Sequence, residues 1–314
     1  MRKREKSIVS IPGILASMVG FNLLIRLHSS MGTKLPIHEA HYYRWKQGNI
    51  YYTKEGSGPP ILLVHDLDPA SSTEEWSKVI PILREKYRVY AIDLIGCGRS
   101  DKPKYLYTQF LYDKLLVDFV RNVIGEKTVV IATGSAVPAA VMAAHLDPEP
   151  FGKIIGVNPR PVSDCSAVPD LKDRILRLIY SSPIVGTFLY NLRYCKPRVL
   201  YEMVNRNYYH PQEADPEIVD LYYRFSHFDH KEAGMLYTSI QSKFMNLDIR
   251  LGLADRKPLA LIFGSAEEQK ERTLAEYTHY GNVTTVKTIP QTAHLPQLEK
   301  EEEFADLVAN FIDE

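Results

Sequence analysis

Hydrophobic and polar positions follow two different periods along this chain. Residues 42–53 alternate in polarity around a Gln-Gly-Asn turn, which predicts a two-stranded hairpin. Residues 59–65 form an unbroken apolar run between turn residues, a pattern typical of a strand buried on both faces of a parallel sheet. Segments of helical period and further short apolar runs then alternate up to residue 158.

The alternation predicts the class of fold. We expect helices over 74–87, 107–124 and 137–145 and strands over 89–93, 128–132 and 153–158. Near the end of the chain the same pattern gives strands over 258–263 and 282–288 and a helix over 301–312. Alternating strands and helices build parallel sheets with right-handed crossovers, so the chain predicts an α/β fold with a doubly wound, mostly parallel sheet.

A different pattern occupies the stretch between residues 160 and 257. Its apolar positions have helical period and many of them are tyrosines. We therefore predict a core made of residues 36–160 and 256–314, an inserted helical cap at 161–255 and a separate N-terminal segment at 1–35. Aromatic walls of this kind suit a small hydrophobic substrate with one polar end. The helices expected in the cap cover 171–180, 184–192, 197–209, 216–225 and 231–244.

The N-terminal segment has the features of a membrane-associating stretch. Residues 8–25 carry no charge and are just long enough to cross a bilayer, and four basic residues precede them within residues 1–6. An interfacial or core-packed amphipathic helix and a cleaved signal are the alternatives, although no clear cleavage site follows. We expect membrane association through residues 8–25, with a cytoplasmic location as the alternative.

Composition excludes several kinds of partner. Lys+Arg and Asp+Glu balance at 38 each, so no overall field would attract nucleic acid. The three cysteines, Cys97, Cys165 and Cys195, have no CxxC spacing, which argues against a disulfide framework and a structural zinc site. We expect no metal and no nucleic-acid partner. With 314 residues and 45% hydrophobic content, the chain can bury the core of one large domain.

Three polar side chains each follow an expected strand. Ser135 lies where the strand at 128–132 gives way to a helix, Glu267 follows the strand at 258–263, and His294 follows the strand at 282–288. Carboxyl ends of parallel strands share one edge of a sheet, so these side chains are expected to converge. We predict that Ser135 attacks, His294 takes its proton and Glu267 orients the imidazole. Backbone amides of Leu67 and Ala136 are expected to hold the oxyanion.

Five stretches together resemble the α/β-hydrolase family from about residue 40 to the end. The resemblance implies a serine hydrolase that cleaves an ester, thioester or related acyl bond of a hydrophobic small molecule through an acyl-enzyme, without a cofactor. The order Ser, acid, His is the family's order. The matching stretches are the oxyanion turn at 62–67, the Asp-x-x-Gly-x-Gly-x-Ser loop at 93–103, the nucleophile turn at 133–137, the acid turn at 264–267 and the histidine turn at 293–299.

Other roles are open for several of these residues. Ser135 is also a suitable helix N-cap. Glu268 and Asp164 are alternative acids, and His65 is expected to be structural.

The chain departs from the family pattern at Thr133, Val137 and Asp66, where the family has glycine. Valine has a Cβ that crowds the junction of strand and helix. A carboxylate at position 66 would oppose a developing negative charge nearby. These departures leave open two alternatives: a hydrolase with a reshaped nucleophile turn, and a non-catalytic ligand-binding or membrane-tethered interaction protein. The loop at 93–103 and the cap also resemble those of haloalkane dehalogenases and epoxide hydrolases. Those enzymes use an aspartate nucleophile where this chain has Ser135, so the resemblance favours a serine hydrolase over them.

Overall fold

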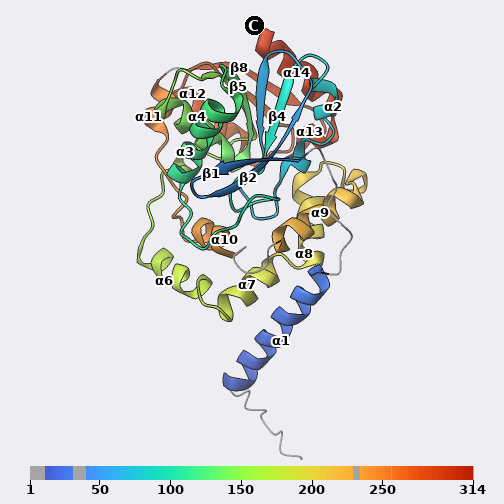
Figure 1. The fold of residues 1–314 in the computed structure, drawn as a ribbon, viewed down its shortest axis with the longest axis vertical. Helices are drawn as coiled ribbons and strands as arrows, with labels where there is room; N and C mark the ends of the chain where they lie inside the picture. Colours follow the sequence, from blue (N-terminus) through green and yellow to red (C-terminus); the bar gives the residue numbers. More distant parts are fainter. Residues whose placement is uncertain (1–10, 31–39, 229–233, 256, 314) are drawn as a thin grey trace, which may run out of the picture.

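The fold was obtained as a computed structural model, which describes residues 11–30, 40–228, 234–255 and 257–313 (Figure 1). An eight-stranded sheet forms its centre, in the order β1-β2-β4-β3-β5-β6-β7-β8. β1, β2 and β4 pair antiparallel, and the remaining pairs are parallel, which confirms the predicted α/β class. The strands are β1 His41–Trp45, β2 Gly48–Glu55, β3 Pro60–Val64, β4 Arg88–Ile92, β5 Thr128–Thr133, β6 Phe151–Val157, β7 Leu259–Gly264 and β8 Val283–Ile289.

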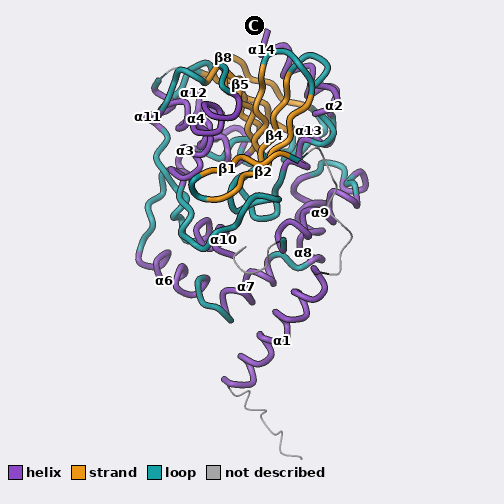
Figure 2. Tube along the Cα trace, in the orientation of Figure 1, coloured by secondary structure: helices purple, strands orange, loops and turns teal. Residues whose placement is uncertain are grey.

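Helices cover both faces of the sheet (Figure 2). One apolar cluster joins the sheet to α3 and α4, and a second joins the other face to α2 and α14. Every residue of β3 is buried, as expected for a central strand with helices on both sides. The helices of this core are α2 Ile80–Leu83, α3 Gln109–Phe119, α4 Val137–Leu146, α12 Lys270–Tyr280, α13 Pro296–Glu299 and α14 Glu301–Asp313, with 3-10 turns at Thr73–Trp76 and Gly134–Ala136 and a π turn at Val120–Ile124.

The helix expected over 74–87 is not continuous. The structure has a 3-10 turn at Thr73–Trp76, capped by the Ser72 side chain, and then the single turn of α2. Pro81 near the start of α2 has no amide hydrogen to bond back to the preceding turn, and its ring would clash with that turn. A continuous helix is therefore broken at this point.

The chain between β6 and β7 forms a set of helices, which we call the helical insertion. Its tyrosines pack into a third apolar cluster together with Leu295 and Leu298, next to His294. The part of the expected helix at 231–244 that falls on residues 231–233 lies outside the described residues. The insertion contains α5 Val162–Cys165, α6 Leu171–Tyr180, α7 Val185–Arg193, α8 Lys196–Glu202, α9 Pro216–His227, α10 Gly234–Gln241 and α11 Arg250–Ala254, with shorter turns at Met203–Asn207 and Pro211–Glu213.

A single long helix, α1 Ile11–Ser30, precedes the sheet. Residues Ile11–Ser29 are long and apolar enough to cross a membrane. The helix is not packed in a core: one face touches α7 and α9, and most of its apolar side chains are exposed. Residues 1–10, which include the basic cluster and the start of the predicted 8–25 segment, lie outside the described residues.

Candidate functional site

The sharp bend between β5 and α4 lies at Gly134. This residue has a φ of 56°, in the left-handed region that glycine enters without strain. Ala132 and Ala136 lie two positions before and after it, in the places where such a bend needs small side chains. The bend is therefore one residue earlier than the one expected at Ser135, and the position from which a nucleophile would project carries no side chain.

The carboxylate of Asp66 fills the space beside this glycine. Its Oδ1 accepts hydrogen bonds from the backbone amides of Ser135 and Leu67, each at 2.7 Å. A Cβ atom added to Gly134 would lie 2.4 Å from the same oxygen. Leu67 thus supplies the amide predicted for the oxyanion, but the second converging amide is that of Ser135, where the sequence predicted Ala136.

The backbone of Asp66 is held on both sides. The Leu94 amide donates to His65 Nε2 at 3.0 Å, so His65 Nδ1 carries the hydrogen and donates to the Asp66 carbonyl at 2.6 Å. The Asp66 amide donates to Glu75 Oε2 at 3.0 Å. These contacts fix the turn, and they agree with the structural role expected of His65.

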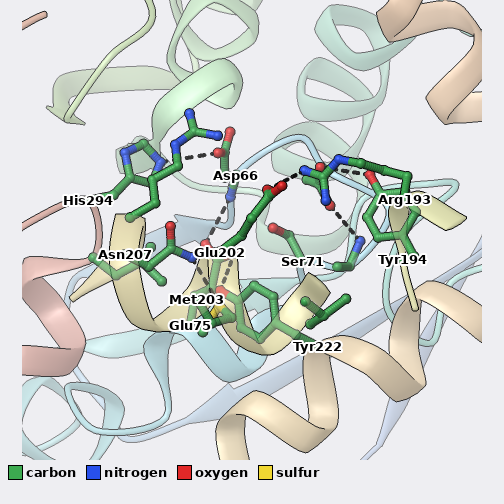
Figure 3. Close-up of a pocket in the computed structure, with 15 residues that line it drawn as sticks. Asp66, Ser71, Glu75, Arg193, Tyr194, Glu202, Met203, Asn207, Tyr222 and His294 are labelled. Atoms are coloured by element: carbon green, nitrogen blue, oxygen red, sulfur yellow. Dashed lines mark hydrogen bonds and ion pairs between the residues drawn. The ribbon is translucent and has the colours of Figure 1, made fainter. Parts of the chain in front are cut away.

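His294 lies between two carboxylates. Its Nδ1 is 3.0 Å from Glu267 Oε2. Its Nε2 is 3.3 Å from Asp66 Oδ2 (Figure 3). The structure therefore brings His294 and Glu267 together, as the sequence predicted. Both ring nitrogens are occupied by carboxylates, which leaves neither for the hydroxyl of Ser135. The role of Ser135 as nucleophile stays a prediction.

The two alternative acids lie elsewhere. Asp164 pairs with Arg272 at 2.7 Å, and Glu268 is exposed to solvent. Among the described parts of the chain, no group of three or more His, Cys, Asp or Glu side chains could hold a metal ion.

The charges around His294 stabilise its protonated form. Burial acts to lower the pKa of His294, but hydrogen bonds and attraction from Asp66 and Glu267 outweigh it and raise the pKa from 6.5 to about 10. Burial likewise acts to raise the pKa of Asp66, but the hydrogen bond to His294 and the two amides hold it below its ordinary value. At neutral pH His294 is therefore an imidazolium that faces the charged carboxylate of Asp66.

This arrangement predicts a pH dependence of stability. A raised pKa in the folded protein contributes stability that is fully present below the unfolded value of 6.5 and is lost as pH rises through about 10. We expect the thermal midpoint of the protein to fall more steeply between these pH values than that of His294→Gln, which has no titrating imidazole. Calorimetry of both proteins across this range measures the difference. Equal slopes would contradict the charge arrangement.

A pocket of about 540 Å³, its open mouth included, adjoins Asp66 and His294. The helical insertion closes it with Tyr194 and Tyr222, whose hydroxyls donate at 2.9 Å to Asp68 and Glu75 respectively (Figure 3). Burial raises the pKa of both Asp68 and Glu75. The pocket is therefore lined by acids from the core and, from the insertion, by phenol hydroxyls and the charged side chains of Arg193, Glu202 and Arg206.

Two further residues position the histidine loop: Asn158, which the sequence analysis did not single out, and Glu299, which it placed in the histidine turn without a role. Asn158, at the end of β6 with a φ of 44°, donates to the carbonyls of Ala293 and His294 and accepts from the Gly264 amide. Glu299 accepts from the amides of Ala293 and Tyr209, which ties the loop to the insertion. Asn158 could have been found from the sequence because it is a polar residue that directly follows a buried strand.

The chain belongs to the Alpha/beta hydrolase family, whose sequence model matches residues 61–307. It is 24% identical over 268 residues to the uncharacterized hydrolase YugF of Bacillus subtilis, covering 84% of this chain and 94% of that one. The fold also resembles the crystal structure of Cfl2 from Burkholderia cenocepacia, with a TM-score of 0.71, 16% identity and coverage of 87% and 95% of the two chains.

Shorter matches reach enzymes with named substrates. The chain is 36% identical over 98 residues to 2-hydroxy-6-oxo-6-(2'-aminophenyl)hexa-2,4-dienoic acid hydrolase of Metapseudomonas resinovorans, covering 30% of this chain and about a third (34%) of that enzyme. It is 38% identical over 73 residues to the soluble epoxide hydrolase of Corynebacterium sp., covering 23% and 24% of the two chains. These relatives are hydrolases, so the comparisons support a hydrolase-type enzyme.

Proposed function

We propose that this protein is a hydrolase in which Asp66 is the nucleophile, and that its substrate is an epoxide of a small hydrophobic molecule. The supporting observation is the position of one carboxylate. Asp66 Oδ1 is held by two backbone amides, while Oδ2 lies 3.3 Å from the ring of His294 and borders the pocket. One oxygen is thus fixed and the other is available to attack.

The first step forms an ester on Asp66. Oδ2 attacks a carbon of the epoxide, the carbon–oxygen bond of the ring breaks, and Oδ1 becomes the carbonyl oxygen of the ester. In such a displacement the leaving oxygen lies on the far side of the attacked carbon. We assign the proton that this oxygen needs to Tyr194 or Tyr222 of the insertion, which line the same pocket as Asp66.

The second step hydrolyses the ester. Esterification removes the charge of Asp66, so one of the two influences that raise the pKa of His294 is lost. The imidazolium can then pass its proton, through solvent, to the phenolate that the first step left. The neutral ring then accepts a proton from the water that attacks Cγ of Asp66. The oxyanion develops on Oδ1, where the amides of Leu67 and Ser135 already point. Collapse breaks the bond between Cγ and Oδ2, and the imidazolium gives its proton to the departing oxygen, which releases the diol. The new carboxylic acid of Asp66 then protonates His294, so the ion pair is restored with the net addition of one water.

One of the relatives and the geometry of the site support this chemistry. The match to a soluble epoxide hydrolase agrees with the resemblance of the 93–103 loop and the insertion to enzymes that use an aspartate nucleophile. The acyl-transfer mechanism through Ser135 needs a free nitrogen on His294 and two free oxyanion amides. Asp66 Oδ2 faces the nitrogen Nε2, and Asp66 Oδ1 accepts from the two amides. A protein that binds a ligand without turnover is the remaining alternative.

Heavy-oxygen labelling tests the proposal. We expect the protein, turning over styrene oxide in water enriched in the heavy oxygen isotope, to incorporate the isotope into the peptide that contains Asp66, as measured by mass spectrometry. Diol formation with an unlabelled Asp66 would overturn it, because water would then attack the epoxide directly.

Two other outcomes assign the rival functions. Absence of turnover together with fluorophosphonate labelling that Ser135→Ala abolishes would favour the serine acyl hydrolase. Absence of turnover and of labelling in folded protein would favour the non-catalytic binding protein.

A further inference from the structure

Helix α6 of the helical insertion has charged side chains on its inner side and large apolar side chains on its outer side. On the inner side Asp173 is buried and pairs with Lys243 at 3.0 Å, and the Arg177 guanidinium lies 4.7 Å from the centre of the Phe244 ring. A helix on the surface of a soluble protein normally turns its charged residues outward. The outward-facing side chains of α6 include the large apolar residues Leu171, Ile175 and Leu178, which are 73%, 50% and 68% exposed.

Helix α1 presents a second exposed apolar surface, and it is attached to the insertion. Phe21 packs edge-on against Phe188 of α7 with ring centres 5.3 Å apart. Asn22 donates to the Ile184 carbonyl at 3.2 Å and accepts from Asn191 at 2.9 Å. These contacts fix α1 relative to α7. The exposed apolar residues of α1 are Ile11, Ile14, Leu15, Val19, Leu23, Leu24 and Leu27.

The attachment limits how far α1 can enter a bilayer by itself. Met18 is the first partly buried residue of α1, so within the described chain only residues 11–17 extend past the insertion. Seven helical residues span roughly 10 Å, whereas the hydrocarbon core is about 30 Å thick. A membrane that takes up α1 in this arrangement must therefore also meet the surface of the insertion.

We propose that α1 and the outer face of α6 form one membrane-binding surface, with α6 lying in the interface of a lipid bilayer. Figure 1 shows α1, α6 and α7 at the same end of the molecule, away from the sheet. Lys172 and Arg174 are exposed on α6 and suit anionic headgroups. Large exposed apolar surfaces mark interaction sites, and an apolar helix face flanked by basic residues is typical of interfacial binding.

Fluorescence quenching by lipid tests the contact at α6 directly. We expect Leu178→Trp in the full-length protein to be quenched by brominated lipid in vesicles of phosphatidylcholine and phosphatidylglycerol. The native residues Trp45 and Trp76 are buried and contribute little to the change. Phe110→Trp on α3, at a site 58% exposed, is the matched control and is expected to stay unquenched. Vesicle binding without quenching at residue 178 would overturn the proposal, because α1 alone would then be the anchor.

Vesicle flotation provides an independent measure. The triple variant Leu171→Ser, Ile175→Ser, Leu178→Ser is expected to bind the same vesicles about tenfold more weakly or worse, since three large apolar side chains are lost from the contact. Phe110→Ser is expected to bind like the parent protein. Unchanged flotation of the triple variant, or no vesicle binding by the parent, would contradict the proposal. A parent protein that is dimeric, a triple variant that is monomeric and no lipid quenching of Leu178→Trp would together also contradict it. That result would assign the α6 face to a second copy of the chain.

Discussion

Replacement of Asp66 by asparagine is expected to lower kcat for epoxide hydrolysis by about a thousandfold or more. Asparagine has nearly the same shape, and its carbonyl oxygen can still accept the amides of Leu67 and Ser135. A neutral amide oxygen is a poor nucleophile and forms no ester, so the loss would reflect chemistry and not misfolding. Steady-state rates, with thermal midpoints of both proteins, measure it.

Ser135→Ala is the matched control for this variant. The alanine keeps the backbone amide that binds Asp66 Oδ1 and removes only the hydroxyl, so activity is expected to stay within a few-fold of the parent. The opposite result, an active Asp66→Asn and an inactive Ser135→Ala, would return the nucleophile to the serine that the sequence indicated.

Gly134→Ser is expected to lower the free energy of unfolding by about 2 to 4 kcal/mol. The new Cβ would lie 2.4 Å from Asp66 Oδ1, and the residue would keep a φ of 56° that side chains rarely adopt. Adding Asp66→Gly removes the clashing carboxylate, so the double variant is expected to recover most of this loss. Denaturant unfolding of the parent, the two single variants and the double variant measures the coupling.

The double variant is also expected to gain reactivity with fluorophosphonates. Removal of Asp66 frees His294 Nε2 and the amides of Leu67 and Ser135, while the new serine occupies the bend after β5. Asp66→Gly alone has no residue at the bend that could be labelled. Additive effects on stability, or equal labelling of the double variant and Asp66→Gly, would show that Asp66 does not replace a side chain at position 134.

The course of the sheet could be predicted from local pattern. The apolar run at 59–65 and the turn at residues 47–49 correspond to β3 and to the β1–β2 hairpin within one or two residues. The meeting of Glu267 and His294 was also predictable, because each follows a parallel strand and such strand ends share one edge. The helix expected over 74–87 failed where Pro81 overrode the helical period.

The position of the bend after β5 could not be read from the motif alone. A pattern centred on Ser135 and one centred on Gly134 both place a small residue near the turn, and only the backbone angle separates them. The role of Asp66 depends in turn on that bend. Its carboxylate can reach the amides of Ser135 and Leu67 because Gly134 has no Cβ to occupy the space.

The sequence by itself determined the α/β class and the order of the strands along the chain, because both follow from local periodicity. It also determined that Glu267 and His294 lie close together, because the ends of parallel strands share one edge of the sheet. Only the tertiary structure decided which group faces His294 Nε2 and which side of α6 is exposed. Both depend on contacts between segments far apart in the chain. Gly134 leaves a gap for Asp66, and the contacts of Asp173 with Lys243 and of Arg177 with Phe244 hold the other side of α6 against the insertion.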